Sequence, residues 1–190
     1  MNLYLSSYLR TITKPADFFK EVDDRHSAQS LLLVAIMGIM TGLNNYLPTV
    51  KSWESMVTDG KFLMHLMMIL LPVIGVFFST ILYAGLLNWV ADKFKPVKKT
   101  DDESPVRMAL PFTYIPTILF LAVSLFIPND EIRLTLNIIV MIWSYGLVVL
   151  MIAVVKQVDY LKAFLITVLA VAVVVVPVAI IYGSFVWLKG

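Results

Sequence analysis

Five long apolar runs dominate the chain and restrict what it can fold into. They cover residues 28–47, 62–90, 108–127, 134–155 and 161–188. A helix needs about 20 residues to cross a hydrocarbon core about 30 Å thick, and each run meets this length. Because backbone polar groups inside lipid must be satisfied within the segment, such runs cross a membrane as helices. The sequence therefore predicts an all-α fold, an integral membrane bundle of five transmembrane helices.

Composition supports the same interpretation. Hydrophobic residues make up 59% of the 190 residues and charged residues 15%, whereas soluble domains have about 45–50% and about 25%. Cysteine is absent, which excludes disulfides, thiolate metal sites and thiol nucleophiles. The formal net charge is only +2, and no basic stripe indicates nucleic acid as a partner.

The residues before the first run form an N-terminal segment, 1–26, ahead of a transmembrane domain, 27–190. One helical face of this segment carries the apolar residues Leu5, Tyr8, Leu9 and Ile12. Pro15 then suits the first turn of a second short helix. We expect a short interfacial amphipathic segment in which Phe18 and Phe19 face the membrane or the bundle.

Short connections constrain how the last three spans are arranged. The residues "PNDE" separate spans three and four, and "KQVD" separates spans four and five. Connections this short require antiparallel neighbours, so these spans should stack consecutively. Asn129 or Asp130 can cap the fourth helix, and Asp159 can cap the fifth. Pro72 and Pro177 lie inside spans two and five, where each removes a backbone donor and can cause a kink.

Two other connections carry interfacial patterns. In the loop 49–60, Val50, Trp53 and Val57 have helical spacing, which predicts a short interfacial helix with its Trp at headgroup level. The segment "DKFKPVKKTDDE" carries four lysines and four acidic residues. It is interpreted either as an anionic-lipid site or as a solvated linker.

Lys and Arg are distributed unevenly between the two sides of the membrane. With five spans, 11 of the 15 cationic residues lie on the side of the N-terminus and four on the other. Positive residues accumulate in cytoplasmic loops. The sequence therefore predicts a cytoplasmic N-terminus and an outside C-terminus, in a bacterial inner membrane.

Residues suited to catalysis are scarce. The two histidines, His26 and His65, are in different segments, and we find no metalloprotease, nucleophile-elbow or phosphate-loop motif. Intramembrane chemistry usually requires charged groups deep inside a span. Here each charged residue lies in a loop or near a helix end. We expect no enzyme activity, no metal site and no cofactor, with His65 as an interfacial polar residue rather than a ligand.

Small residues in two spans predict close helix packing. Gly38 and Gly42 form a G-x-x-x-G face in span one, and Gly75 and Ser79 repeat this spacing in span two. Small residues allow helix backbones to approach closely. The spacing does not distinguish packing within the bundle from a dimer interface. Uncharged polar residues in the spans likewise fit either helix packing or a polar path for a small solute or lipid headgroup.

Several soft motifs together resemble a known family. They are "KPADFFKEV" before the first span, "LPFTYIPTILF" in the third, "IWSYGLVVL" in the fourth and "YLKAFLITVLAV" in the fifth. With five spans, this pattern resembles the Yip family of Ypt/Rab-interacting membrane proteins, in a compact bacterial form. By resemblance, the family-like positions are Pro15, Phe18, Phe19, Pro111, Tyr114, Pro116, Trp143, Gly146, Lys162 and Ala163.

The resemblance implies a non-enzymatic membrane protein that organises or binds membrane proteins or lipids. Its expected partners are membrane lipids, other membrane proteins or further copies of itself. The alternative is a small-solute transporter, channel or lipid-scrambling protein with a path along Tyr83, Asn88 and Tyr114. A polar path between the spans would distinguish the alternative from a close-packed bundle.

The cation distribution leads to a direct test of topology. Alkaline phosphatase fused to the C-terminus should be active, because the enzyme folds outside the cytoplasm, and a fusion at Lys98 should be inactive. The reverse pattern would contradict either the five spans or their orientation.

Overall fold

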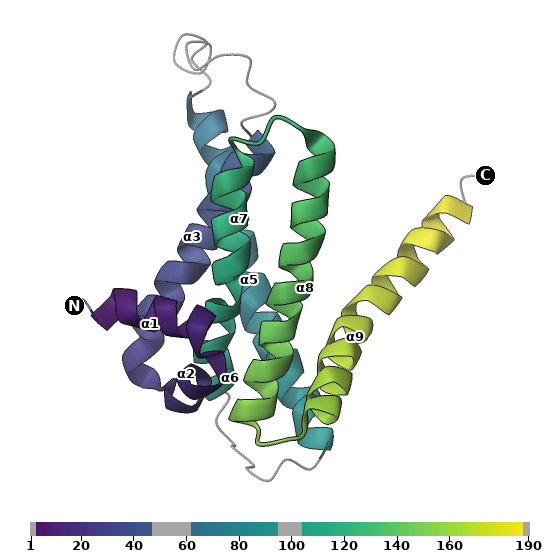
Figure 1. Cartoon of the computed structure of the whole chain (residues 1–190). Helices are drawn as coiled ribbons and strands as arrows, with labels where there is room; N and C mark the ends of the chain where they lie inside the picture. Colours follow the sequence, from purple (N-terminus) through teal and green to yellow (C-terminus); the bar gives the residue numbers. More distant parts are fainter. Residues whose placement is uncertain (1–2, 47–61, 95–103, 188–190) are drawn as a thin grey trace.

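The structure is a computed structural model that describes residues 3–46, 62–94 and 104–187. Five of its helices are long and apolar enough to cross a membrane, which makes the chain an integral membrane protein with an all-α fold. Figure 1 shows four of them side by side, with the fifth leaning away at one end.

Helices form every regular element in the described ranges. In chain order they are α1 (Leu3–Thr13), α2 (Pro15–Glu21), the 3₁₀ turn η1 (Asp24–His26), α3 (Ser27–Tyr46), α5 (Phe62–Lys93), α6 (Ser104–Ala109), the 3₁₀ turn η3 (Leu110–Tyr114), α7 (Ile115–Ser124), α8 (Asp130–Val155) and α9 (Tyr160–Trp187). We call the end of the bundle where α1, α2 and α6 lie the N-terminal end; it is the lower end in Figure 1.

The third span departs from the uninterrupted helix expected over 108–127. It is built from α6, η3 and α7, begins four residues earlier and ends at Ser124. Pro111 lies within η3 and Pro116 in the first turn of α7. A proline has no N–H to donate, so two prolines five residues apart favour a tighter turn between two helices over one α-helix.

The contact between α3 and α5 is unusually close. Gly38 and Gly42 are buried, and an added Cβ at Gly38 would overlap the backbone of Val73. At Gly42, it would lie 2.5 Å from the carbonyl oxygen of Ile69. Backbone atoms cannot move aside as a flexible side chain can. The glycine face of α3 is therefore an internal one, in contact with the backbone of α5.

The ends of α8 and α9 have the capping groups expected from the sequence. Asn129 Oδ1 accepts from the backbone N–H groups of Glu131 and Ile132, at 2.9 and 3.1 Å. Asp159 Oδ1 accepts from the N–H of Lys162 at 2.9 Å. These contacts confirm the Asn129 and Asp159 caps, and α7, α8 and α9 stack consecutively as expected.

The turn between α8 and α9 reverses the chain through Gln157, whose φ is +53°. The N–H of Val158 donates to the carbonyl of Ala153 across this turn, at 3.1 Å. This is the hydrogen bond of a Schellman C-cap, in which glycine usually takes the left-handed position. The tight turn places the start of α9 directly beside the end of α8.

The N-terminal segment folds back onto the bundle. Pro15 is the first residue of α2, as the sequence predicts. Arg10 and Glu21 join α1 to α2 through two guanidinium–carboxylate hydrogen bonds of 2.8 Å each. Phe18 and Phe19 are 1% and 2% exposed and belong to the main hydrophobic core. The two short helices therefore cover one end of the bundle.

Only the first half of α9 is attached to the bundle. Ala163, Ile166 and Ala170 are fully buried on one face of it. Beyond Ala170 the described valines, residues 171 and 173–176, are between 39% and 55% exposed. Figure 1 shows the C-terminal half of α9 diverging from α8. From Val171 to Val176, this half therefore has no buried side chain.

Some sequence expectations lie outside the described residues. They are the interfacial helix at 49–60 with Val50, Trp53 and Val57, the lysine-rich connection after Phe94, and the side chain of His65.

The close α3–α5 contact predicts a sharp difference between two identical substitutions. Gly38→Ala should lower the free energy of unfolding by about 1–3 kcal/mol, because the new methyl group forces two backbones apart. Gly85→Ala should be neutral or raise it by up to about 1 kcal/mol, because a Cβ there meets nothing within 4 Å and alanine favours helix. Thermal unfolding in mild detergent measures both; equal stability of the two variants would rule out the contact.

Candidate functional site

Aromatic rings gather at the N-terminal end of the bundle. We call this set, Tyr8, Phe18, Phe19, His26 and Phe112, the aromatic cluster. Phe18 lies 4.7 Å from Phe112 between ring centroids, and the His26 ring lies 5.7 Å from Phe18. Because aromatic pairs add about 0.5–1.5 kcal/mol beyond their buried area, these contacts hold α2 against η3. The cluster is a packing unit rather than a ligand site.

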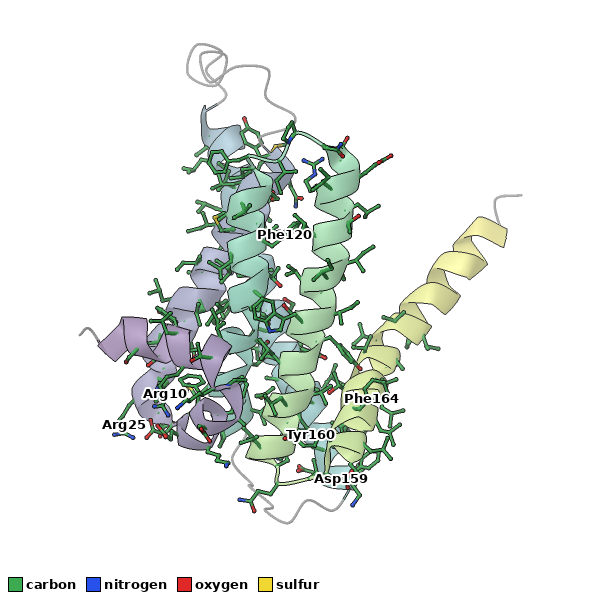
Figure 2. All side chains as sticks on the ribbon, viewed as in Figure 1. Arg10, Arg25, Phe120, Asp159, Tyr160 and Phe164 are labelled. Atoms are coloured by element: carbon green, nitrogen blue, oxygen red, sulfur yellow. The ribbon has the colours of Figure 1, made fainter. Side chains whose placement is uncertain are left out.

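Charged groups surround the aromatic cluster. Asp23 caps η1 and accepts from the guanidinium of Arg25 at 2.8 Å. This hydrogen bond is the main reason that the pKa of Asp23 falls to about 2. The ionised cap therefore stabilises the folded state at pH values above the ordinary pKa of an Asp side chain, and this stabilisation is lost as the pH falls toward 2. Figure 2 shows Arg10, Arg25 and Asp159 at this same end of the molecule.

Side-chain hydrogen bonds join α3 to the third span at both ends. Near the N-terminal end, Ser30 donates its hydroxyl to the carbonyl of Met108. Near the other end, Asn44 donates to the carbonyl of Leu121 at 2.9 Å and accepts from Ser124 at 2.7 Å. Such bonds between membrane helices contribute about 0.6 kcal/mol each on average. Together they fix α3 against α6 and α7.

Two further hydroxyl pairs connect neighbouring spans. Thr80 of α5 and Tyr114 of η3 are 2.9 Å apart, and so are Thr117 of α7 and Ser144 of α8. Several polar residues of the spans are thus used in contacts between helices. In the described part of α9, by contrast, the only hydroxyl between Tyr160 and Pro177 is that of Thr167, which donates to Ala163 within the same helix.

Lys156 and Asp92 form an ion pair at the N-terminal end. The Lys156 side chain is 0% exposed, and its Nζ lies 3.2 Å from Asp92 Oδ1. Asp92 is 39% exposed. Lys156 also has a further interaction within the chain. The buried ammonium therefore connects the end of α8 to the end of α5, where the sequence indicated only a charge near a helix end.

The family-like positions divide into two groups. The structure brings together those of α2 (Pro15, Phe18 and Phe19) and those of the third span (Pro111, Tyr114 and Pro116), since α2 contacts η3 through the aromatic cluster. The remaining positions are on α8 and α9. Trp143 is 43% exposed, Gly146 is exposed, Lys162 pairs with Asp159, and Ala163 is buried against the bundle.

A wedge-shaped cavity separates α5 from α9. Its volume is about 310 Å³, and its lining comes from Ser79, Leu82, Tyr83 and Leu86 of α5 and Ala170, Val171, Val174 and Val175 of α9. The lining is almost wholly apolar. We call this cavity the α5–α9 wedge. Its α9 residues, from Ala170 to Val175, begin where the second half of this helix diverges from α8 in Figure 1.

Gly75 and Ser79 behave differently from Gly38 and Gly42. An added Cβ at Gly75 would meet nothing within 4 Å, and Ser79 is exposed. Their spacing therefore does not mark a close contact within the described chain. At about 100° per residue, Gly75 lies on the same side of α5 as Ser79, Leu82 and Leu86, which line the wedge.

The structure tests two expectations about chemistry and transport within its described residues. Among the described residues, no three His, Asp or Glu side chains are close enough to hold a metal ion. Of the path expected for a transporter, Tyr83 lines the α5–α9 wedge, while Tyr114 is bonded to Thr80. The Oδ1 atom of Asn88 is buried without a hydrogen-bond partner in the described part of the chain. Of these three residues, Tyr83 lines the wedge and the other two do not.

Comparison with known protein families gives a match over most of the chain. The family model of the Yip1 domain matches residues 9–181, which covers α2 to α8 completely, the last five residues of α1 and most of α9. No curated protein and no solved structure matches the chain.

The Lys156–Asp92 pair predicts an asymmetric response to mutation. Asp92→Asn removes the negative partner of a buried ammonium and should lower the free energy of unfolding by about 1–3 kcal/mol. This is less than for a fully buried pair, because Asp92 is partly exposed. Lys156→Met should cost less, because the remaining carboxylate can be hydrated. Thermal unfolding of both variants and of the double variant tests this order. A Lys156→Met variant less stable than Asp92→Asn would contradict it.

Proposed function

The chain belongs to the Yip1-domain family, and from that premise we propose that it organises other membrane proteins without acting as an enzyme. The family consists of multi-pass membrane proteins and is not known for enzymatic activity. The observation that carries the proposal is the α5–α9 wedge. We propose that the wedge receives a transmembrane helix of a partner protein.

The lining of the wedge fits a helix. Gly75 and Ser79 are small residues one turn apart on α5. A Cβ added at Gly75 would have no atom of the described chain within 4 Å. Small residues at this spacing let a second backbone come close enough for packing contacts and weak hydrogen bonds. A partner helix can make these contacts along the side of α5 that carries Gly75, Ser79, Leu82 and Leu86. Acyl chains cannot make the same hydrogen bonds.

The state of α9 supports the same proposal. From Val168 to Pro177, α9 has no polar side chain with which to bind α5 or α8. Apolar side chains gain little by exchanging lipid for one another, so this half of α9 has little reason to close onto the bundle. A helix placed between α5 and α9 would contact both and bury the exposed valines. The proposed partner helix would therefore pack against the exposed valines of α9 and the side of α5 that faces them.

Site-specific photocrosslinking in native membranes tests the proposal. A benzophenone amino acid at Leu82, which is 67% exposed in the wedge, should form a discrete protein adduct. The same probe at Ile139 of α8, which is 54% exposed on another surface, is the matched control and should not. Gly75→Ile should reduce the Leu82 adduct severalfold, because a branched side chain blocks close approach.

The products distinguish the competing functions. Mass spectrometry of the adduct identifies the partner as a different protein or as a second copy. Lipid adducts alone at Leu82, or the same protein adducts at Leu82 and Ile139, would contradict the proposal. Faster movement of a fluorescent lipid or a small solute in reconstituted vesicles than in protein-free vesicles would instead favour the scrambling or transport alternative.

A further inference from the structure

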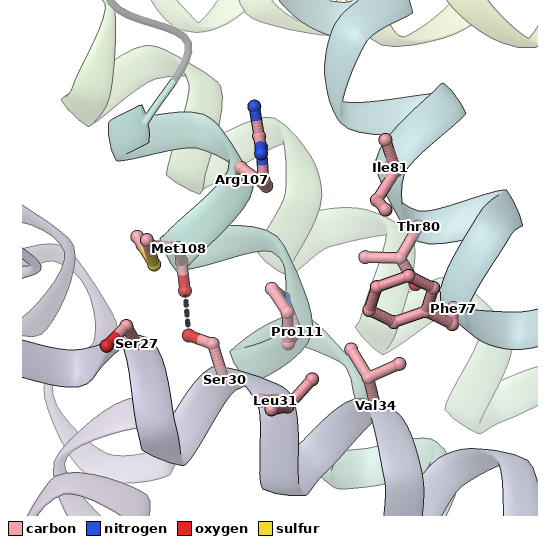
Figure 3. Close-up of a pocket in the computed structure, with 10 residues that line it drawn as sticks. All are labelled: Ser27, Ser30, Leu31, Val34, Phe77, Thr80, Ile81, Arg107, Met108 and Pro111. Carbon is pink, nitrogen blue, oxygen red and sulfur yellow. Dashed lines mark hydrogen bonds between the residues drawn. The ribbon is translucent and has the colours of Figure 1, made fainter. Parts of the chain in front are cut away.

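A second cavity lies on the opposite face of α5, between α3, α5 and the start of the third span. Its volume is about 200 Å³. Phe77, Thr80 and Ile81 contribute to it from α5 and share one helical face. The wedge residues lie on the other face, so this cavity is independent of the proposed helix-binding site. Figure 3 shows it with α3 along one side and α5 along the other.

The lining of this cavity changes from polar to apolar with depth. On α3 the lining residues are Ser27, Ser30, Leu31 and Val34, which form one helical stripe. Ser27 begins α3 at the N-terminal end of the bundle, and Val34 lies about 10 Å farther along the helix axis. Arg107 of α6 stands at the edge of the same cavity (Figure 3). Most of the cavity surface is apolar, and on α3 the polar lining residues lie nearer the N-terminal end than the apolar ones.

We propose that this cavity binds an anionic phospholipid. The phosphate lies beside the guanidinium of Arg107, and the upper part of one acyl chain lies between α3 and α5. A guanidinium has five N–H donors, so Arg107 keeps its interaction within the chain while donating to the phosphate. Leu31, Phe77 and Ile81 are 57%, 40% and 36% exposed, which gives the chain a route to the surrounding lipid.

The size of the cavity favours part of a lipid over a whole soluble ligand. Sites that enclose a small molecule usually measure about 300–1,000 Å³. A volume of about 200 Å³ is too small for that, but a phospholipid needs only its glycerol region and the first part of one chain inside. The remainder stays in the bilayer.

Two hydroxyl groups of the lining already take part in hydrogen bonds within the protein. Ser30 already donates to the Met108 carbonyl, as the dashed line in Figure 3 shows, and Thr80 is engaged with Tyr114. The positive charge of Arg107 is therefore the main determinant of headgroup choice. This chemistry selects phosphatidylglycerol-like lipids over zwitterionic ones, whose own amine offsets the phosphate charge.

Lipid titration of the purified protein by native mass spectrometry tests the proposal. The wild-type protein should bind phosphatidylglycerol more tightly than phosphatidylcholine with the same acyl chains. Arg107→Gln should reduce phosphatidylglycerol affinity about fivefold, as expected for loss of one cation near the headgroup, and leave phosphatidylcholine unchanged. Arg107→Lys should retain most of the preference. Ile81→Trp, which fills the apolar part, should weaken the binding of both lipids.

Matched variants and a soluble competitor complete the experiment. Arg133→Gln and Ile139→Trp change the same residue types elsewhere in the chain and should bind as the wild type does. Glycerol 3-phosphate should not displace the lipid. The proposal is overturned if Arg107→Gln or Ile81→Trp binds like the wild type, if Arg133→Gln loses as much as Arg107→Gln, or if glycerol 3-phosphate competes fully, since the site would then recognise free phosphate.

Discussion

Apolar side chains in a bilayer gain little by leaving acyl chains for one another, and the architecture of this protein depends on that constraint. The helices are held together where backbones touch or polar groups meet. Gly38 and Gly42 bring α3 against the backbone of α5. Asn44 and Ser30 bind α3 to the third span. α3 is therefore the helix around which the close-packed part of the bundle is organised.

The remaining spans follow the same rule. The Thr117–Ser144 pair joins α7 to α8, and the buried Lys156 joins the end of α8 to α5. Among the described side chains of α9, Ala163, Ile166 and Ala170 pack against the bundle, and the Phe164 ring makes an edge-on contact with Tyr145, with centroids 6.1 Å apart. α9 is the helix that departs from the bundle. The α5–α9 wedge lies on one face of α5, beside the diverging half of α9. The cavity between α3 and α5 lies on the other face, beside the break in the third span.

The sequence could predict features that depend on local chemistry. Span lengths follow from the thickness of a bilayer, and Asn129 and Asp159 cap helices because their side chains reach the free N–H groups. The docking of α2 was only half predictable, because the Phe18–Phe19 pair fits either the membrane or the bundle. Burial of both rings in the core resolves this choice.

Features that depend on which helices meet could not be predicted. Gly38–Gly42 and Gly75–Ser79 have the same spacing, yet only the first pair touches another backbone in the described chain. Small-residue spacing permits close approach but does not select a neighbour. The partner of Lys156 is likewise 64 residues away, beyond any local pattern. The 3₁₀ break has a visible signal in Pro111 and Pro116, because two prolines five residues apart remove two backbone donors from one span.

Distance measurements between spin labels test the central claim, that α9 is held less tightly than the other spans. The chain contains no cysteine, so single labels can be introduced without other changes. Labels at Ile139 of α8 and Ile39 of α3 report on the hydrogen-bonded bundle, and labels at Ile139 and Val174 report on α9; all three side chains are at least 40% exposed. In lipid nanodiscs, the account predicts a narrow distance distribution for the first pair and a clearly broader one for the second. Equally narrow distributions for both pairs would show that apolar contact alone fixes α9, and would contradict the account.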